Sequence, residues 1–92
     1  MTNFYFIAKL NKVISSKNCK EIVTRMREFE WNNNSDNSDY MHVYAFWKSK
    51  SSDISIRYDN EYNFVNDLIN LQQIEKLSFW KYLSFSLLGM AL

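Results

Sequence analysis

The chain has 92 residues, of which 47% are hydrophobic and 17% aromatic, and its formal net charge is +1. This is enough apolar material for a single folded domain, residues 1–92, and it excludes a disordered chain. The small net charge excludes a global field that would draw the protein to nucleic acid or to a membrane surface.

Glycine and proline are almost missing: Gly89 is the only glycine and there is no proline. Walker and dinucleotide-binding loops need clustered glycines, because their backbone must approach a phosphate closely, so both classes are excluded. Turns are expected at Asn, Asp and Ser, whose short side chains hydrogen-bond their own backbone.

Cys19 is the only cysteine, so an internal disulfide is excluded. Small secreted domains usually need disulfides, and residues 1–12 lack the basic, apolar and small-residue regions of a signal peptide. These features predict a cytoplasmic protein. The richness in Asn, Lys, Ile, Ser, Phe and Tyr is typical of AT-rich coding sequence and points to a bacterial or phage origin.

The first predicted elements are a strand and a helix. Residues 3–10 alternate as a strand with apolar side chains on both faces, which predicts cover on two sides. Residues 18–31 form an amphipathic helix, in which Asn18 is the N-cap and Glu21 completes a capping box. Its expected buried stripe consists of Cys19, Ile22, Val23, Met26 and Phe29.

The middle of the chain predicts a hairpin. Residues 32–39 are uniformly polar and predict a loop. Residues 40–48 carry apolar side chains on both faces, as in a central strand, and residues 53–58 alternate as a third strand with Ile54, Ile56 and Tyr58 inward. Residues 49–52 would form the hairpin loop.

The last predicted elements are two helices. Asp59 or Asn60 caps a second helix. Its stripe consists of Phe64, Val65, Leu68, Ile69 and Gln72, widened by Leu71 and Ile74. Residues 77–92 are apolar and fit a helix better than a buried strand, and the run is shorter than the ~20 residues that a bilayer span needs. The order β-α-β-β-α, followed by this segment packed on the sheet, predicts an α+β fold.

Few residues suit chemistry, so no catalytic or cofactor-binding residue, no cofactor and no metal site are predicted. His42 is the only histidine, and Cys19 lies on a buried stripe where cysteine acts as a small hydrophobe. One Cys and one His cannot form a structural zinc site. A calcium loop would lack its glycine and its terminal glutamate among Asn33, Asn34, Asp36, Asn37 and Asp39. The chain is therefore predicted not to be an enzyme.

An acidic and aromatic stretch is the best candidate for a binding surface. Carboxylates at element ends are normally hydrated, which disfavours general acid and base roles for them. Tyrosine and tryptophan are favoured anchors of interfaces, because they bury a large area with little entropy loss. The predicted partner-binding residues are Asp53, Tyr58, Asp59, Glu61, Tyr62, Asp67, Tyr40 and Trp47.

Three functions are compatible with these observations. The first is non-enzymatic protein binding, by a small inhibitor or immunity-type protein that occludes a basic partner such as a toxin or nuclease. The second, ranked lower, is a nucleic-acid-binding module that stacks bases on an open aromatic sheet face. The third is a structural or oligomeric subunit, with a homodimer formed through residues 77–92.

Overall fold

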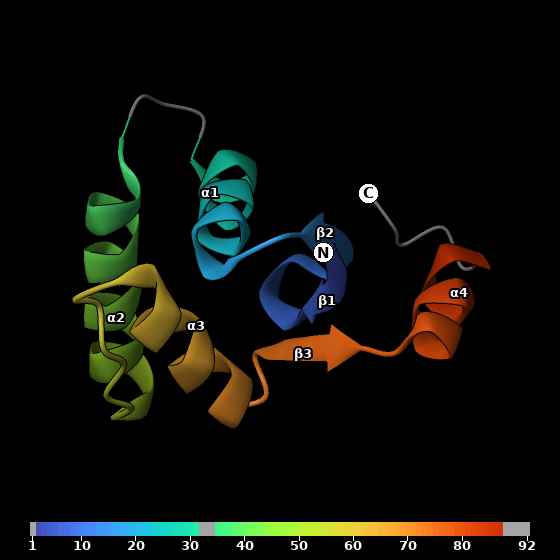
Figure 1. Ribbon diagram of the computed structural model, residues 1–92. Coiled ribbons are helices and arrows are strands. Elements are labelled where there is room, and N and C mark those ends of the chain that lie inside the picture. Colours follow the sequence, from blue (N-terminus) through green and yellow to red (C-terminus); the bar gives the residue numbers. More distant parts are fainter. Residues whose placement is uncertain (1, 32–34, 88–92) are drawn as a thin grey trace.

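The centre of the fold is a three-stranded antiparallel sheet. The computed structural model describes residues 2–31 and 35–87 (Figure 1). The strand order is β2-β1-β3, so the first strand of the chain lies in the middle. The strands are β1 (Asn3–Ile7), β2 (Lys12–Ser16) and β3 (Ile74–Leu77).

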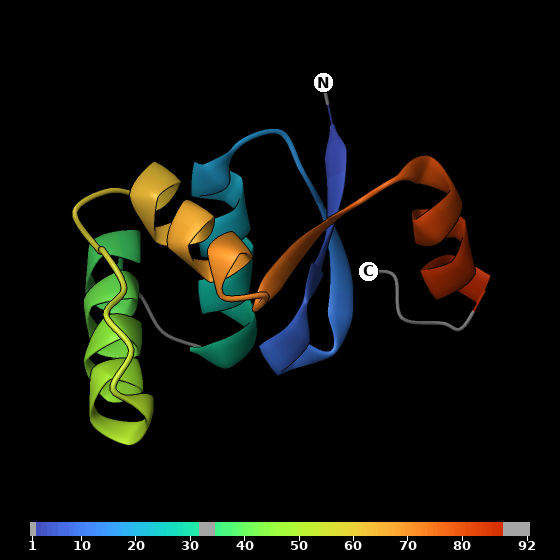
Figure 2. The ribbon, with the colours of Figure 1, turned by 90° about the horizontal axis from the view of Figure 1, so that it is seen from below.

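The helices lie on both sides of this sheet and confirm the α+β class. They are a 3-10 turn, η1 (Ala8–Leu10), and the α-helices α1 (Cys19–Glu30), α2 (Asn37–Ser52), α3 (Glu61–Asn70) and α4 (Phe79–Leu87). Helices α1 and α3 pack against one side of the sheet, and α2 packs on them from outside. Helix α4 lies on the opposite side of the sheet (Figure 2). No helix in the described ranges is long and apolar enough to cross a membrane.

A tight turn at an asparagine joins β1 to β2. Asn11 has a φ of 52°, and its N–H donates to the carbonyl of Ala8 over 3.1 Å. Asn tolerates this left-handed conformation, and Asp53, with a φ of 54°, ends α2 in the same way. The expectation that Asn and Asp make the turns is confirmed at these two positions.

The sheet is covered on both faces, as the apolar pattern of the first strand predicts. On one face Ile7 and Ile14 join the main core. On the other face Phe4 lies opposite Leu77, which is 7% exposed, and its ring stacks on Tyr82 of α4 at 3.8 Å. The C-terminal segment is thus helical as far as residue 87 and packs on the sheet; residues 88–92 lie outside the described part.

Helix α1 forms where its caps predict. The Asn18 side chain accepts from the N–H of Glu21 at 2.9 Å, as an N-cap does. The capping box is not closed as predicted, because the Glu21 carboxylate accepts from the N–H of Lys17 at 3.2 Å and the N–H of Asn18 donates to Ser16 Oγ at 3.2 Å. Phe29 is 50% exposed, so its place on the buried stripe was wrong. In the last turn Glu30 occupies the inward side instead, because it contacts Lys9 and Tyr40.

Helix α3 begins where its cap predicts but is shorter than expected. It ends at Asn70, so Leu71 and Gln72 lie in the turn after it and Ile74 starts β3. Asn60 is the N-cap, and its side chain accepts from the N–H of Asn63 at 2.7 Å. The expected stripe faces inward, with Phe64, Val65 and Leu68 buried and Ile69 partly buried. This stripe packs on α1 and β3 and closes the core.

The predicted hairpin was wrong. Residues 40–48 belong to α2, and residues 53–58 belong to no strand. Apolar side chains on both sides fit a helix with two apolar faces as well as a central strand, and pattern alone does not separate them. The expected loop at residues 32–39 is also corrected, because residues 37–39 start α2; residues 32–34 are not described.

The strand partners of β1 differ from the expected ones. They are β2 and β3, which lie in segments that the pattern did not assign to strands. In residues 53–58 the expected alternation partly holds without a ladder: Ile56 is buried and Ile54 partly buried, whereas Tyr58 is 48% exposed.

The core predicts a large effect for one aromatic residue. Phe64 is fully buried and its ring contacts those of Tyr40 and Tyr44. Phe64→Ala should lower the free energy of unfolding by about 3–5 kcal/mol in urea denaturation. Tyr62→Ala on the same helix is the control, since Tyr62 is 67% exposed and its loss should cost about 0.5 kcal/mol or less. Equal effects of the two changes would contradict this packing.

Candidate functional site

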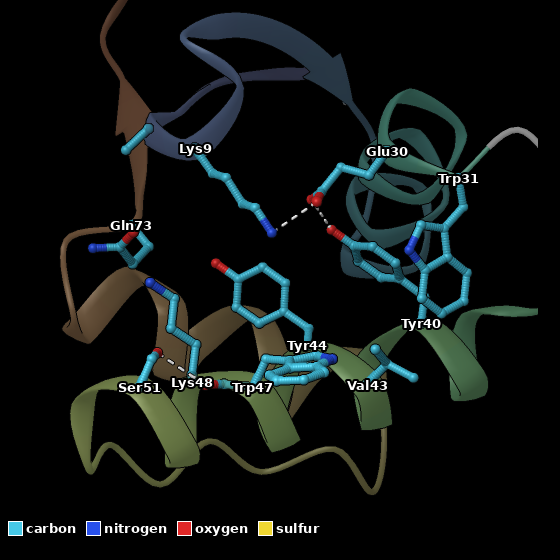
Figure 3. Close-up of a pocket in the computed structure, with 11 residues that line it drawn as sticks. Lys9, Glu30, Trp31, Tyr40, Val43, Tyr44, Trp47, Lys48, Ser51 and Gln73 are labelled. Atoms are coloured by element: carbon cyan, nitrogen blue, oxygen red, sulfur yellow. Dashed lines mark hydrogen bonds and ion pairs between the residues drawn. The ribbon is translucent and has the colours of Figure 1, made fainter.

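A groove of about 590 Å³ lies between α2, the η1 turn and the end of α1 (Figure 3). Its volume is in the range of small-molecule sites, which are mostly apolar with a few placed polar groups. The walls are largely aromatic, with Trp31, Tyr40, Tyr44 and Trp47. The polar groups come from separate segments, namely Lys9, Glu30, Lys48, Ser51 and Gln73.

A carboxylate joins three elements at one side of the groove. Glu30, at the end of α1, has a side chain only 17% exposed. Lys9 Nζ of η1 lies 2.7 Å from Glu30 Oε2, and the Tyr40 hydroxyl of α2 donates to Glu30 Oε1 (Figure 3). A poorly hydrated carboxylate needs such partners, because removing it from water is otherwise costly.

Tyr40 is not a surface residue, and its expected role as a partner anchor is corrected. It is 1% exposed, and its ring makes edge contacts with Trp31 at 5.3 Å and Phe64 at 6.5 Å. Burial raises the pKa of Tyr40 above its ordinary value, and the hydrogen bond and charge of Glu30 act in the same direction. Tyr40 therefore remains a protonated donor that holds α2 to α1.

Tyr44 lies one helical turn further along α2 and has a different environment. It is 6% exposed, and Lys9 Nζ lies 4.8 Å from the centre of its ring. Its buried hydroxyl has no hydrogen-bond partner among the described residues. Burial raises the pKa of Tyr44 to about 12, and the negative charge of Glu30 contributes. An unsatisfied buried hydroxyl costs about 1–3 kcal/mol.

Trp47 and Lys48 form the open side of the groove. Trp47 is 62% exposed, which confirms its expected place at the surface. Lys48 is partly buried and forms no ion pair with any described residue. The groove therefore carries a cation whose charge no neighbour neutralises, in contrast to Lys9.

The predicted acidic residues lie around α3 and the segment before it, and one of them is already satisfied. The Arg57 guanidinium donates to both carboxylate oxygens of Asp67 at 2.8–3.2 Å, and the Arg57 N–H donates at 2.8 Å. These hydrogen bonds hold the pKa of Asp67 below its ordinary value. Asp67 thus fixes the connector to α3 within the chain.

The other acidic residues are exposed or held by neutral groups. The Asp59 carboxylate accepts from the Asn63 side chain at 3.0–3.1 Å, and Glu61 accepts from the Asn37 side chain at 3.2 Å. Asp53 is exposed at the end of α2. None of Asp53, Asp59 and Glu61 forms an ion pair with a described residue.

Two of the predicted tyrosines are at the surface near these carboxylates. Tyr58 is 48% exposed, and its ring stacks on that of His42 at 4.8 Å. Tyr62, in the first turn of α3, is 67% exposed. The expected surface position of Tyr62 is therefore confirmed. Tyr58 is at the surface as its expected partner-binding role needs, so its expected inward position on a third strand was wrong.

The described residues offer no metal-binding cluster, since no three His, Cys, Asp or Glu side chains gather in them as ligands would. Cys19 is partly buried, and burial raises the pKa of its thiol, with the charge of Glu61 acting in the same direction. A raised pKa lowers the fraction of reactive thiolate. Cys19 therefore has the character of a packing residue, as its position on the stripe of α1 predicts.

No protein-family model matches the chain, and no curated protein or solved structure is detectably similar to it. Function is therefore inferred from the geometry and chemistry of the described residues alone.

The two neighbouring tyrosines of α2 predict opposite responses to the same change. Tyr40→Phe removes the hydroxyl that donates to Glu30 and should lower the free energy of unfolding by about 1.5–3 kcal/mol, because that bond is to a charged group. Tyr44→Phe removes an unpaired donor and should leave stability unchanged or raise it. Urea denaturation of both variants measures the difference. Equal losses in the two would contradict the assignment.

The raised tyrosine pKa values predict alkaline sensitivity. The unfolded chain releases the Tyr44 proton near the ordinary value of 10.0, whereas the folded chain keeps it until about 12. Because the folded state then binds more protons, stability falls as pH rises from 10 towards 12, by at most about 1.4 kcal/mol per pH unit for each tyrosine. Urea midpoints at pH 8, 10 and 11 should fall less steeply in Tyr44→Phe.

Proposed function

We propose that this protein acts without catalysis by binding another protein, as a small inhibitor or immunity-type protein that occludes a toxin, nuclease or other effector. The observation that carries the proposal is the outward face of α2. Phe46 is 48% exposed and Trp47 is 62% exposed. Tyr58, in the segment after α2, is 48% exposed, and its ring stacks on that of His42 of α2. Large aromatic side chains left in water together are typical of protein interfaces.

Helix α2 supports this proposal because it is apolar on two sides. Its inward side buries Tyr40, Met41, Tyr44 and Ala45. Its outward side exposes Val43, Phe46 and Trp47. Large apolar side chains that are exposed together on a second side of a helix have the character of a surface that a partner covers.

The charge beside this surface favours a basic partner. Between residues 53 and 67 the carboxylates are Asp53, Asp59, Glu61 and Asp67, and the only cation is Arg57. Arg57 is bound to Asp67 and also attracts Asp59. None of Asp53, Asp59 and Glu61 forms an ion pair with a described residue. Unpaired surface charge steers a partner of opposite sign and raises the association rate more than the affinity.

The nucleic-acid alternative needs an open aromatic sheet face. In the structure Phe4 is stacked on Tyr82, and Val13 and Leu77 are buried on the same face, 1% and 7% exposed. A base cannot stack on a ring that another ring covers. This observation favours protein binding over base stacking.

Self-association through α4 is a second candidate, because that helix exposes large apolar side chains. Phe79 is 61% exposed, Trp80 76% and Leu87 89%. If copies pair through these residues, sedimentation velocity should show a dimer that Trp80→Lys converts to monomer. A full-length chain that sediments as a monomer at high micromolar concentration would remove this candidate.

The main proposal is tested with the product of the neighbouring gene as the probe, since inhibitors of this kind are commonly encoded beside their targets. Co-purification and calorimetry should show a specific complex. Trp47→Ala should weaken it at least about thirtyfold, as expected for an interface anchor. Trp80→Ala is the matched control, because this tryptophan is also exposed, at 76% against 62% for Trp47, but lies on α4.

Reversing the charge of single carboxylates tests whether the acidic residues beside the aromatic surface speed the association with a basic partner. Asp59→Lys should slow association and make it less sensitive to salt, whereas Glu28→Lys, the same type of change on α1, should alter neither. An association rate unaffected by Asp59→Lys, or equal losses in the two tryptophan variants, would count against this surface.

A further inference from the structure

The groove of Figure 3 has the make-up of a small-molecule site, and this inference does not rest on the proposed protein partner. Its volume is about 590 Å³ and its walls are aromatic. Two of its polar groups, the Tyr44 hydroxyl and the Lys48 ammonium, have no partner among the described residues. Ligand sites typically combine such walls with a few convergent polar groups.

Tyr44 is the more informative of the two groups. The Tyr44 side chain is only 6% exposed, and its hydroxyl donates to no acceptor among the described residues. Figure 3 shows this hydroxyl pointing into the groove, towards the side where Lys48 lies. Buried hydroxyls nearly always have a partner, so this donor calls for an acceptor from outside the chain.

The cations of the groove indicate the charge of that acceptor. Lys9 is neutralised by Glu30 at 2.7 Å, so its charge is already used. Lys48 is partly buried and unpaired in the described structure, and it attracts an anion. Because Lys48 is the one cation lining the groove that is unpaired among the described residues, a singly charged carboxylate matches the site better than a doubly charged phosphate.

The walls indicate the rest of the ligand. Trp31 and Trp47 offer flat apolar surfaces to the groove. Val43 of α2, which is 39% exposed, adds an aliphatic side chain to the same wall. Planar aromatic groups bind well against such walls, by offset stacking or edge contacts. The Lys9 side chain, held by Glu30 and lying 4.8 Å from the centre of the Tyr44 ring, forms a further wall of the groove.

We propose that this groove binds a small aromatic monocarboxylate, with the carboxylate between Tyr44 and Lys48 and the ring against Trp47. The Tyr44 hydroxyl donates to one carboxylate oxygen, and Lys48 Nζ pairs with the other. Ser51 and Gln73 close the polar end of the groove, and Trp31 lies at the aromatic end.

The probe for this proposal is 2-naphthoate, and calorimetry measures its affinity. A dissociation constant of about 1 mM or tighter is expected for a ligand of this size. The neutral isostere 2-naphthamide should bind at least about tenfold more weakly, because it cannot pair with Lys48. Acetate should not bind measurably, since it lacks the ring. Chemical-shift changes in ¹H–¹⁵N spectra should centre on residues 43–48.

Two variants test the polar contacts. Tyr44→Phe and Lys48→Gln should each weaken 2-naphthoate at least about tenfold. Lys50→Gln is the matched control on the same helix, because Lys50 does not line the groove and should leave the affinity unchanged. Tyr44→Phe keeps the shape of the side chain and removes only an unpaired donor, so a folded variant is expected and circular dichroism verifies it.

Three results would overturn the proposal. The first is no saturable binding of 2-naphthoate at millimolar concentration. The second is equal affinity for 2-naphthoate and 2-naphthamide, which would remove the role of charge. The third is an affinity that Tyr44→Phe and Lys48→Gln leave unchanged, which would place the ligand elsewhere.

Discussion

The arrangement of the helices depends on the carboxylate of Glu30. It is largely removed from water, and it is satisfied by Lys9 from the turn after β1 and by Tyr40 from the second turn of α2. A carboxylate in this position is costly unless both partners are present, so it fixes the end of α1, the η1 turn and the start of α2 together. With Tyr40 held in this way, Tyr44 is placed one turn later, against Phe64 and on the floor of the groove.

The helices with clear caps could be predicted from the sequence, and the one with two apolar sides could not. Asn18 and Asn60 allow the starts of α1 and α3 to be predicted, because each side chain accepts a hydrogen bond from a backbone N–H in the first turn of its helix. Helix α2 has such a cap too, since Asp36 accepts from the N–H of Asp39 at 2.8 Å. That cap lies within a polar tract typical of loops, and the apolar run after it also fits a strand. Only packing on α1 and α3 selects the helix.

The candidate surface was partly predictable and the groove was not. Exposure of Tyr58 and Tyr62 follows from their positions near element ends. Trp47 was expected to be exposed beside a hairpin loop that does not form, and it is exposed because it lies on the outward side of α2. Tyr40 was expected at the surface by the same argument, but it lies on a helix and its hydroxyl donates to Glu30. No local sequence pattern relates these two residues. The groove is beyond sequence reasoning for the same reason: its lining comes from η1, α1, α2 and the segment before β3, which only the tertiary fold brings together.

Helix α2 connects the two proposed activities through Trp47 and its neighbour Val43, which both line the groove and are exposed on the outward side. Trp47 is part of the outward aromatic surface and also lines the groove, whereas Lys48 and Tyr44 belong to the groove alone. A ligand stacked on Trp47 changes the surface that a partner meets, and a partner that covers Trp47 changes access to the groove. If both sites are used, binding at one must therefore alter affinity at the other by the same factor, because such coupling is reciprocal. The sign depends on the Trp47 ring: coupling is negative where ligand and partner compete for one face of it, and positive where they take opposite faces and each holds the ring for the other.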